Sequence, residues 1–117
     1  MATTTITPTT LALDTQSADL PITGGTAIVA GNDHKIAYPQ QGKLLIVLNN
    51  TYAGSKDFTV GAGDFLAAGQ GALTIAMAQD DVRFLVLNSD RFKDSDGNVV
   101  ITVASSTTGF IMAFYLP

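Results

Sequence analysis

Large apolar residues alternate with polar or small residues along much of the chain, in short runs that are typical of β-strands. Phe58 and Val60 alternate with Asp57 and Thr59, and the same period of two runs through residues 73–78. This period places the larger side chains on one face of an extended strand. We therefore expect strands at 57–60 and 73–78, and further strands at 26–30, 82–87 and 99–103.

Two other runs are apolar on both faces. Residues 44–48 are all apolar and are followed by two asparagines, so we expect a buried strand at the centre of a sheet. Residues 110–116 form a second run of this kind. Because a small two-layered domain buries one face of each sheet, the other face of this run needs cover from a partner subunit, from the N-terminal segment or from long loops of the same chain.

Two segments are rich in turn residues. Residues 94–98, Asp-Ser-Asp-Gly-Asn, predict a β-hairpin turn flanked by strands, because Asp-Gly supplies the positive φ angles that tight turns need. Residues 61–71 contain four glycines and predict a long loop with Phe65 and Leu66 at its tip.

The first 20 residues are rich in threonine, contain Pro8 and have few large apolar side chains. Proline fixes one backbone angle and threonine favours extended backbone, so this segment predicts an extended arm or an edge strand, with simple fraying of the terminus as the alternative. Leu11 and Leu13 favour docking of the arm, and we expect them to find their cover in an assembly. The expected division is an arm at 1–20 and one domain at 21–117.

The strand pattern and the composition agree on the fold class. All ten acidic residues are aspartates, and the chain has 15 threonines, 15 alanines and 11 glycines. Aspartate and glycine are poor helix formers and threonine favours strands. We therefore expect an all-β protein with about seven or eight short strands, folded as a single antiparallel β-sandwich of the jelly-roll or immunoglobulin-like type.

Charge and composition exclude several classes of function. With 117 residues, 46% of them hydrophobic, the chain suits one packed domain. The net charge is −4 and the six cations are scattered, so we expect no nucleic-acid binding. There is no cysteine, no apolar run of 18 residues and no signal-peptide pattern at the start, so we expect no disulfide, no membrane association and synthesis in the cytoplasm.

The sequence offers little for catalysis or metal binding. His34 is the single histidine, and no Gly-x-Ser-x-Gly turn accompanies it, so we interpret it as a solvated loop residue. Residues 94–98 resemble the start of a calcium loop but lack the later bidentate acid, which favours the hairpin. The loop at 61–71 lacks the ending of a phosphate-binding loop. We therefore expect no catalytic residue, no metal site and no cofactor.

Self-association is the remaining property that the sequence favours. The two-faced run at 110–116 predicts a homo-oligomer, a dimer or a trimer. The candidate assembly contacts are the apolar residues of this run, of the arm and of the glycine-bearing loop: Leu11, Leu13, Phe65, Leu66, Phe110, Met112, Phe114 and Tyr115. Tyr52 lies in a predicted turn, and an exposed tyrosine there leaves carbohydrate binding open.

Four segments in a fixed order carry a resemblance to a known family. They are 43–50 (KLLIVLNN), 58–64 (FTVGAGD), 69–75 (GQGALTI) and 89–97 (SDRFKDSDG). Together they resemble small structural proteins encoded near the major capsid gene of tailed bacteriophages, whose pattern is LLVVxN, TVxAGD, GxGDLTV and SARFxQxDGxV. The resemblance covers about residues 20 to 117. Ala72, where aspartate is more usual, and the apolar ending depart from it.

The resemblance implies a non-enzymatic virion component, a decoration or cement protein that binds the major capsid protein on the capsid surface. The implied protein is made in the cytoplasm of the host bacterium. The alternative is a carbohydrate-binding or host-attachment module of a phage tail, which would bind a glycan as an isolated protein.

Overall fold

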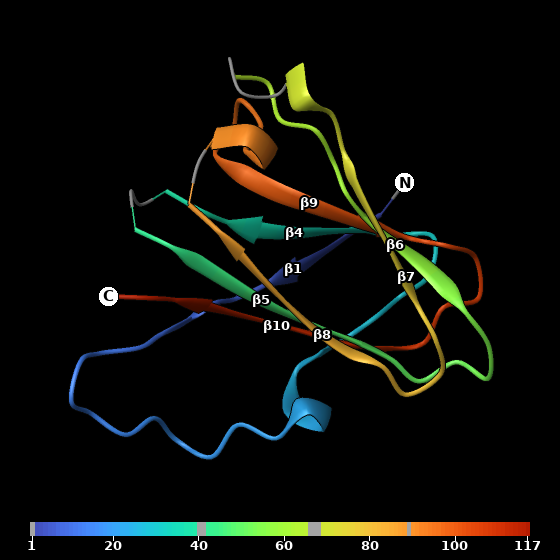
Figure 1. The fold of residues 1–117 in the computed structure, drawn as a ribbon, viewed down its shortest axis with the longest axis horizontal. Helices are drawn as coiled ribbons and strands as arrows, with labels where there is room; N and C mark the ends of the chain where they lie inside the picture. Colours follow the sequence, from blue (N-terminus) through green and yellow to red (C-terminus); the bar gives the residue numbers. More distant parts are fainter. Residues whose placement is uncertain (1, 40–41, 66–68, 89) are drawn as a thin grey trace.

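The computed structural model describes residues 2–39, 42–65, 69–88 and 90–117. These residues form β-strands and short 3-10 turns, among them η1 (Ile22–Gly24) and η3 (Asp90–Phe92), and they contain no α-helix (Figure 1). The prediction of an all-β protein is therefore confirmed.

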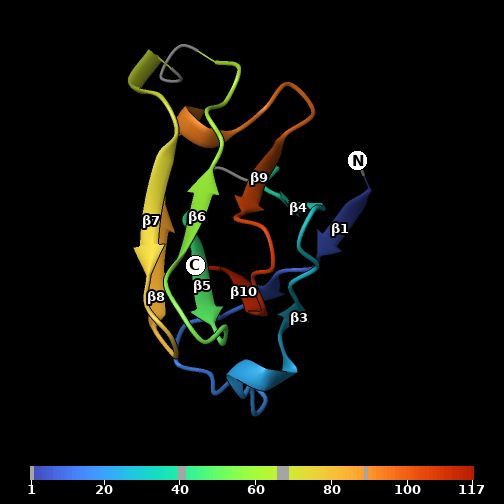
Figure 2. The same cartoon turned by 90° about the vertical axis from the view of Figure 1, so that its right-hand side faces the viewer.

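The strands form two sheets. Sheet A has the order β1 (Thr3–Ile6), β4 (Asp33–Ala37), β9 (Asn98–Val103), β6 (Lys56–Val60) and β7 (Leu73–Met77). Sheet B has the order β2 (Thr9–Thr10), β10 (Gly109–Tyr115), β5 (Leu44–Asn50) and β8 (Val82–Leu87), and β3 (Thr26–Ala27) also pairs with β10. In Figure 2, β7 and β8 lie along one side of the molecule and β1 lies on the other.

Both sheets are mixed, so the prediction of purely antiparallel pairing is wrong. β1 pairs in parallel with β4, and β2 pairs in parallel with β10, whereas the other pairs are antiparallel. The two parallel strands come from the first ten residues, which reach β4 and β10 through long connections. Parallel pairing needs such a connection, because a tight turn reverses the chain.

One apolar core contains residues from both sheets. Its fully buried members include Phe58 and Ile101 from sheet A and Leu44, Ile46 and Ile111 from sheet B. All seven residues of β5 are buried except one, which is half-buried. The prediction of a strand buried on both faces is therefore confirmed. The predicted faces of β6 and β9 are also confirmed, since Phe58, Val60, Val99 and Ile101 are buried.

Two local predictions need correction. The strand expected at 26–30 is limited to Thr26–Ala27, and Ile28 packs against the core without pairing as a strand residue. The turn at 94–98 has the expected positive φ of 81° at Gly97. The strand expected before this turn is not formed, because residues 90–92 form η3. Only Lys93 pairs with Val99 there, as an isolated bridge.

The first 20 residues contribute to both sheets. β1 and β2 are edge strands, and Ile6 is 2% exposed in the shared core. Of the two interpretations left open, arm or edge strand, these ten residues adopt the second. Beyond Thr10 the chain forms a loop held on the same edge of β10 at both ends, because the Leu11 N–H donates to the Tyr115 oxygen and the Ile28 N–H donates to the Gly109 oxygen.

Candidate functional site

The side of sheet B that faces away from the core is apolar across three strands. Cross-strand pairing places Met112 of β10 beside Val47 of β5, and Val47 beside Phe84 of β8. Every second residue along these strands lies on the same side of the sheet, because side chains alternate between the two faces of a strand. We call the following seven residues the outer apolar face: Leu45, Val47, Val82, Phe84, Val86, Met112 and Phe114.

The outer surface of sheet A is different. Asp57, Thr74 and Thr102 are exposed there, and they alternate with the buried residues of β6, β7 and β9. A polar outer surface on one sheet is ordinary for a domain of this size, whereas an apolar one needs cover. The two sheets therefore differ in what they present to solvent.

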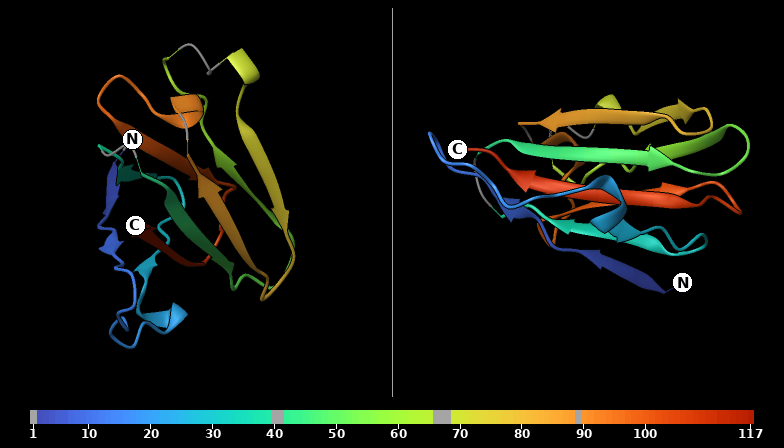
Figure 3. Two further views of the ribbon diagram at one scale, coloured as in Figure 1. Left: turned by 60° about the vertical axis from the view of Figure 1, so that its left-hand side comes forward. Right: turned by 90° about the horizontal axis from the view of Figure 1, so that it is seen from below.

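Residues 11–22, which we call the covering segment, lie over part of the outer apolar face. Between them runs a groove of about 550 Å³, lined by Leu11, residues 17–20 and Ile22 on one side and by six members of the face on the other. In the right panel of Figure 3, strands β8, β5 and β10 lie side by side, and the blue covering segment runs along the β10 side. Val47 and Phe114 are accordingly buried, with 6% and 8% exposure.

The β8 side of the face has no such cover. Phe84 is 69% exposed, Val86 is 53% exposed and Val82 is 42% exposed. β8 is also the last strand of sheet B, and no strand in the described part of the chain pairs with its far side. An edge strand with large apolar side chains is a template for pairing with another chain.

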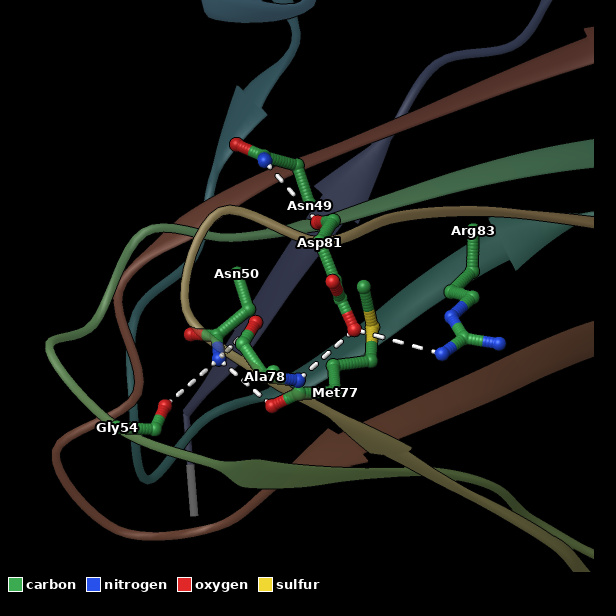
Figure 4. Close-up of polar contacts among 7 residues, drawn as sticks. All are labelled: Asn49, Asn50, Gly54, Met77, Ala78, Asp81 and Arg83. Atoms are coloured by element: carbon green, nitrogen blue, oxygen red, sulfur yellow. Dashed lines mark hydrogen bonds and ion pairs between the residues drawn. The ribbon is translucent and has the colours of Figure 1, made fainter.

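A polar network fixes the start of β8 (Figure 4). The fully buried Asn50 side chain donates from Nδ2 to the backbone oxygens of Gly54, Met77 and Ala78, at 3.0, 2.9 and 3.2 Å, and its Oδ1 accepts from the Tyr52 N–H at 3.0 Å. These bonds hold the end of β7 against the end of β5.

Asp81 completes this arrangement from the turn between β7 and β8. Its Oδ2 accepts the Ala78 N–H at 3.0 Å and lies 3.4 Å from the Arg83 guanidinium. The Asn49 side chain donates to the Asp81 backbone oxygen at 3.3 Å (Figure 4). The geometry of the β7–β8 turn, and with it the position of the exposed edge, is set by side chains of β5.

His34 is a correction to the sequence interpretation, because it is a fully buried residue of β4 and not a solvated loop residue. Its Nε2 accepts the Val29 N–H at 3.1 Å, so in the neutral ring Nδ1 carries the proton and donates to the Ile101 oxygen at 3.3 Å. Burial lowers the pKa of His34, against smaller opposing effects of the Ile101 bond and of Asp33. Both ring nitrogens therefore serve the fold.

The carboxylates of Asp94, in the 94–98 turn, and of Asp64 also accept hydrogen bonds from the backbone of this turn. Asp94 Oδ1 accepts the N–H groups of Asp96 and Asn98, and Asp64 Oδ2 accepts the Ser95 N–H. Among the described residues there is no group of three or more histidine, cysteine or acidic residues that could hold a metal ion. These contacts are those of a hydrogen-bonded turn.

The residues that the sequence predicts as assembly contacts do not lie in one place. Leu11, Met112 and Phe114 line the groove, and Phe110 lies half-buried on the same side of β10. Tyr115 points to the core side, where its hydroxyl donates to the Ala37 oxygen and burial raises its pKa.

The remaining nominated residues lie elsewhere. Leu13 is 75% exposed in the covering segment, and Phe65 is 44% exposed in the loop after β6. Leu66 lies outside the described residues. The structure therefore brings Leu11 together with Met112 and Phe114 and leaves Tyr115, Leu13 and Phe65 apart from them.

Sequence reasoning missed Val82, Phe84 and Val86. Their alternation with Arg83 is visible in the sequence, and it predicts that the three valine and phenylalanine side chains share a face. The missing information was the position of the strand at the edge of its sheet, which leaves that face exposed.

Comparisons of the chain with models of protein families, with curated proteins and with solved structures found no match. Within the described residues, no helix has the length and apolar character needed to span a membrane. The protein is an all-β chain with two mixed sheets, and its most distinctive surface is the outer apolar face.

Proposed function

We propose that this protein is a non-enzymatic structural protein of a bacteriophage virion, a decoration or cement protein that binds the major capsid protein on the capsid surface. The observation that carries the proposal is the outer apolar face, which the covering segment leaves exposed along β8. An apolar patch bounded by polar surface is typical of a protein–protein contact. The ordered resemblance of four segments to phage structural proteins supplies the class of partner.

The finer description of the fold belongs to the same proposal. Two sheets that share one core support a β-sandwich of the jelly-roll or immunoglobulin-like type, in which residues 21–117 supply the other strands. Residues 1–20 then form an arm that is integrated into the fold, because β1 and β2 are edge strands of the two sheets, Ile6 lies in the shared core and the loop that follows supplies one wall of the groove. Such an arm can be anchored on the domain while its exposed residue Leu13 contacts a neighbouring protein.

The physical action of such a protein is interfacial. Each copy that docks removes apolar surface from water, which contributes roughly 25 cal/mol for each Å² buried, less the entropy of docking. Many copies on one lattice add their contributions, so the particle gains resistance to heat without any chemical step. A homo-oligomeric form would present several apolar faces to the lattice together.

The test is reconstitution on capsids of the phage that encodes this chain. Purified protein is added to particles that lack it, the particles are collected by sedimentation, and bound protein and the temperature of particle disruption are measured. We expect the wild-type protein to bind and to raise that temperature. Phe84→Asp, which places a charge on the exposed part of the outer apolar face, is expected to abolish both effects.

Val29→Asp is the matched control, because Val29 is 47% exposed and lies outside the outer apolar face. Equal binding by both variants would refute the assigned surface, and absence of wild-type binding would refute the function. Binding of a glycan by the isolated protein would favour the tail-module alternative instead. That alternative has weaker structural support, because Tyr52 is 37% exposed and the Lys56 ammonium lies 4.3 Å from the centre of its ring.

A further inference from the structure

We propose that β8 is the contact strand of a two-fold symmetric dimer, in which it pairs in antiparallel fashion with β8 of a second copy of this chain. This inference concerns the surface used in the proposed function, but it applies to the isolated protein and needs no capsid. Its partner is identified by the backbone edge and by the order of side chains along it.

The edge strands of the two sheets differ in the side chains that they expose. The exposed residues of the edge strands β1, β2 and β7 are threonines and one alanine: Thr3, Thr5, Thr9, Thr10, Thr74 and Ala76. β8 exposes Val82, Phe84 and Val86 on its outer face instead, together with Arg83 on the opposite face. Each unpaired edge presents backbone N–H and C=O groups, but along β8 the same edge also offers large apolar side chains to a neighbouring strand.

The three exposed apolar residues of β8, Val82, Phe84 and Val86, are arranged symmetrically along the strand. On the outer face of β8 the order of side chains is valine, phenylalanine, valine. This order is the same in both chain directions, with Phe84 at its centre. An antiparallel pair of β8 strands with a two-fold axis at Phe84 places Phe84 opposite its own copy. It also places Val82 opposite the second copy's Val86, and Val86 opposite the second copy's Val82. All three cross-strand pairs are apolar, and aromatic and β-branched pairs are those that stabilise antiparallel strands.

Charge disfavours the register whose two-fold axis lies at Arg83. Arg83 carries the only charge within β8, and its side chain is 57% exposed and paired with Asp81. A two-fold axis at Arg83 would set two guanidinium groups directly opposite each other, which is destabilising. An axis at Phe84 sets Arg83 opposite the second copy's Leu85, so the two guanidinium groups are diagonal neighbours and not directly opposed.

Two-fold pairing is also self-limiting. Each β8 edge is used once, so the contact closes at two copies and does not extend into a fibre. The resulting sheet carries two outer apolar faces side by side, each with its own groove. The dimer therefore doubles the apolar surface that the proposed function would place on a lattice.

The first measurement is the mass of the isolated protein in solution at about 10–100 µM, by sedimentation or light scattering. We expect twice the 12.2 kDa of one chain. Phe84→Lys is expected to give a folded monomer, because two opposed ammonium groups replace the central aromatic pair. Thr74→Lys on the exposed face of β7 is the control and should remain a dimer. A wild-type monomer, or a dimer that survives Phe84→Lys, would overturn the proposal.

The second measurement determines the register by disulfide formation. Because the chain has no cysteine of its own, only the introduced thiols can form a disulfide. Phe84→Cys is expected to form a disulfide with its own copy on mild oxidation, since opposed residues lie within disulfide range. Val82→Cys alone should not do so, whereas a mixture of Val82→Cys and Val86→Cys should give the mixed dimer. Paired thiols meet at millimolar effective concentration, so oxidation should be about 100-fold faster than for Val82→Cys alone at 10 µM.

Equal rates for Phe84→Cys and Val82→Cys alone would indicate random collision or another interface and would refute the register. The outcomes separate the two proposals. A monomer that still binds capsids refutes the dimer and leaves the proposed function standing. A dimer that does not bind capsids refutes the function and leaves the dimer standing.

Discussion

Replacement of Asn50 by alanine is expected to cost far more stability than the same change at its neighbour Asn49. Asn50 is fully buried, and its side chain bonds to four backbone groups at distances of 2.9 to 3.2 Å. Asn49 is also buried, but it makes one side-chain bond, at 3.3 Å to the Asp81 oxygen. The two residues are adjacent on β5 and lose the same atoms, so the comparison isolates the polar network.

The expected magnitude follows from the bonds. An amide has two N–H donors, and with the accepted Tyr52 N–H the alanine variant loses about three full hydrogen bonds, each with a net value of about 1 kcal/mol. Asn50→Ala should therefore lower the free energy of unfolding by about 3 kcal/mol, against about 1 kcal/mol or less for Asn49→Ala. Asn50→Asp should be worse than alanine at neutral pH, because its carboxylate faces three carbonyl oxygens.

The assay is urea unfolding at pH 7 followed by circular dichroism. With a slope of about 1–3 kcal/mol per molar urea, a loss of about 3 kcal/mol lowers the midpoint by roughly 1–3 M. A difference of less than about 0.5 kcal/mol between the Asn50 and Asn49 variants, which is within the error of such extrapolations, would refute the reasoning that the buried network stabilises the β7–β8 turn.

Three further predictions test other parts of the fold. Ile6→Ala should lower the free energy of unfolding by about 2–5 kcal/mol, because Ile6 fills the shared core, whereas Thr5→Ala on the exposed side should change it little; equal effects in thermal unfolding would show that β1 is not part of the stable sheet. The pKa of His34 lies below the ordinary 6.5, so the unfolded chain binds the proton more readily, and the stabilisation from its neutral form is complete above pH 6.5 and is lost as the pH falls through the folded-state pKa. His34→Gln should remove this contribution to the fall in the free energy of unfolding between pH 7.5 and 5.5. Parallel curves of unfolding free energy against pH for the wild-type protein and the variant would contradict this. Gly97→Val should cost about 1–2 kcal/mol through backbone strain, because φ at Gly97 is 81°, and an unchanged Tm would speak against that turn geometry.

Local patterns in the sequence predict the strands that form the core, and they do so for a physical reason. In β6 the alternation of apolar and polar side chains indicates which face is buried. In β5 the continuous apolar run indicates that both faces are buried. The parallel pairing of β1 and β2 has no such local signal, because a run of threonines does not specify its partner strand. The paired residues of β1 and β4, such as Thr3 and Asp33, lie 30 positions apart in the sequence.

The candidate site was predicted in part for the same reason. The apolar outer side of β10 is visible in residues 110–116, but the cover over it comes from residues 11–22 at the other end of the sequence. His34 appears polar and isolated in the sequence, and its burial depends on bonds to Val29 and to Ile101, which lies 67 residues away. The exposure of Phe84 follows from the position of β8 at a sheet edge, which no single residue encodes.

The position of β10 in sheet B has a consequence for folding of the nascent chain. β10 pairs with β2, β3 and β5, so residues 9–10, 26–27 and 44–50 all obtain a neighbouring strand from residues 109–115. During synthesis β2, β3 and β5 emerge before β10 and cannot pair with it until it has been made. Pairing over such long sequence separations is also slow. Until β10 arrives, the apolar β5 strand lacks cover on one side and is open to pairing with other chains. Production of soluble protein should therefore depend on chaperones or on low temperature more strongly than the stability of the finished fold would suggest.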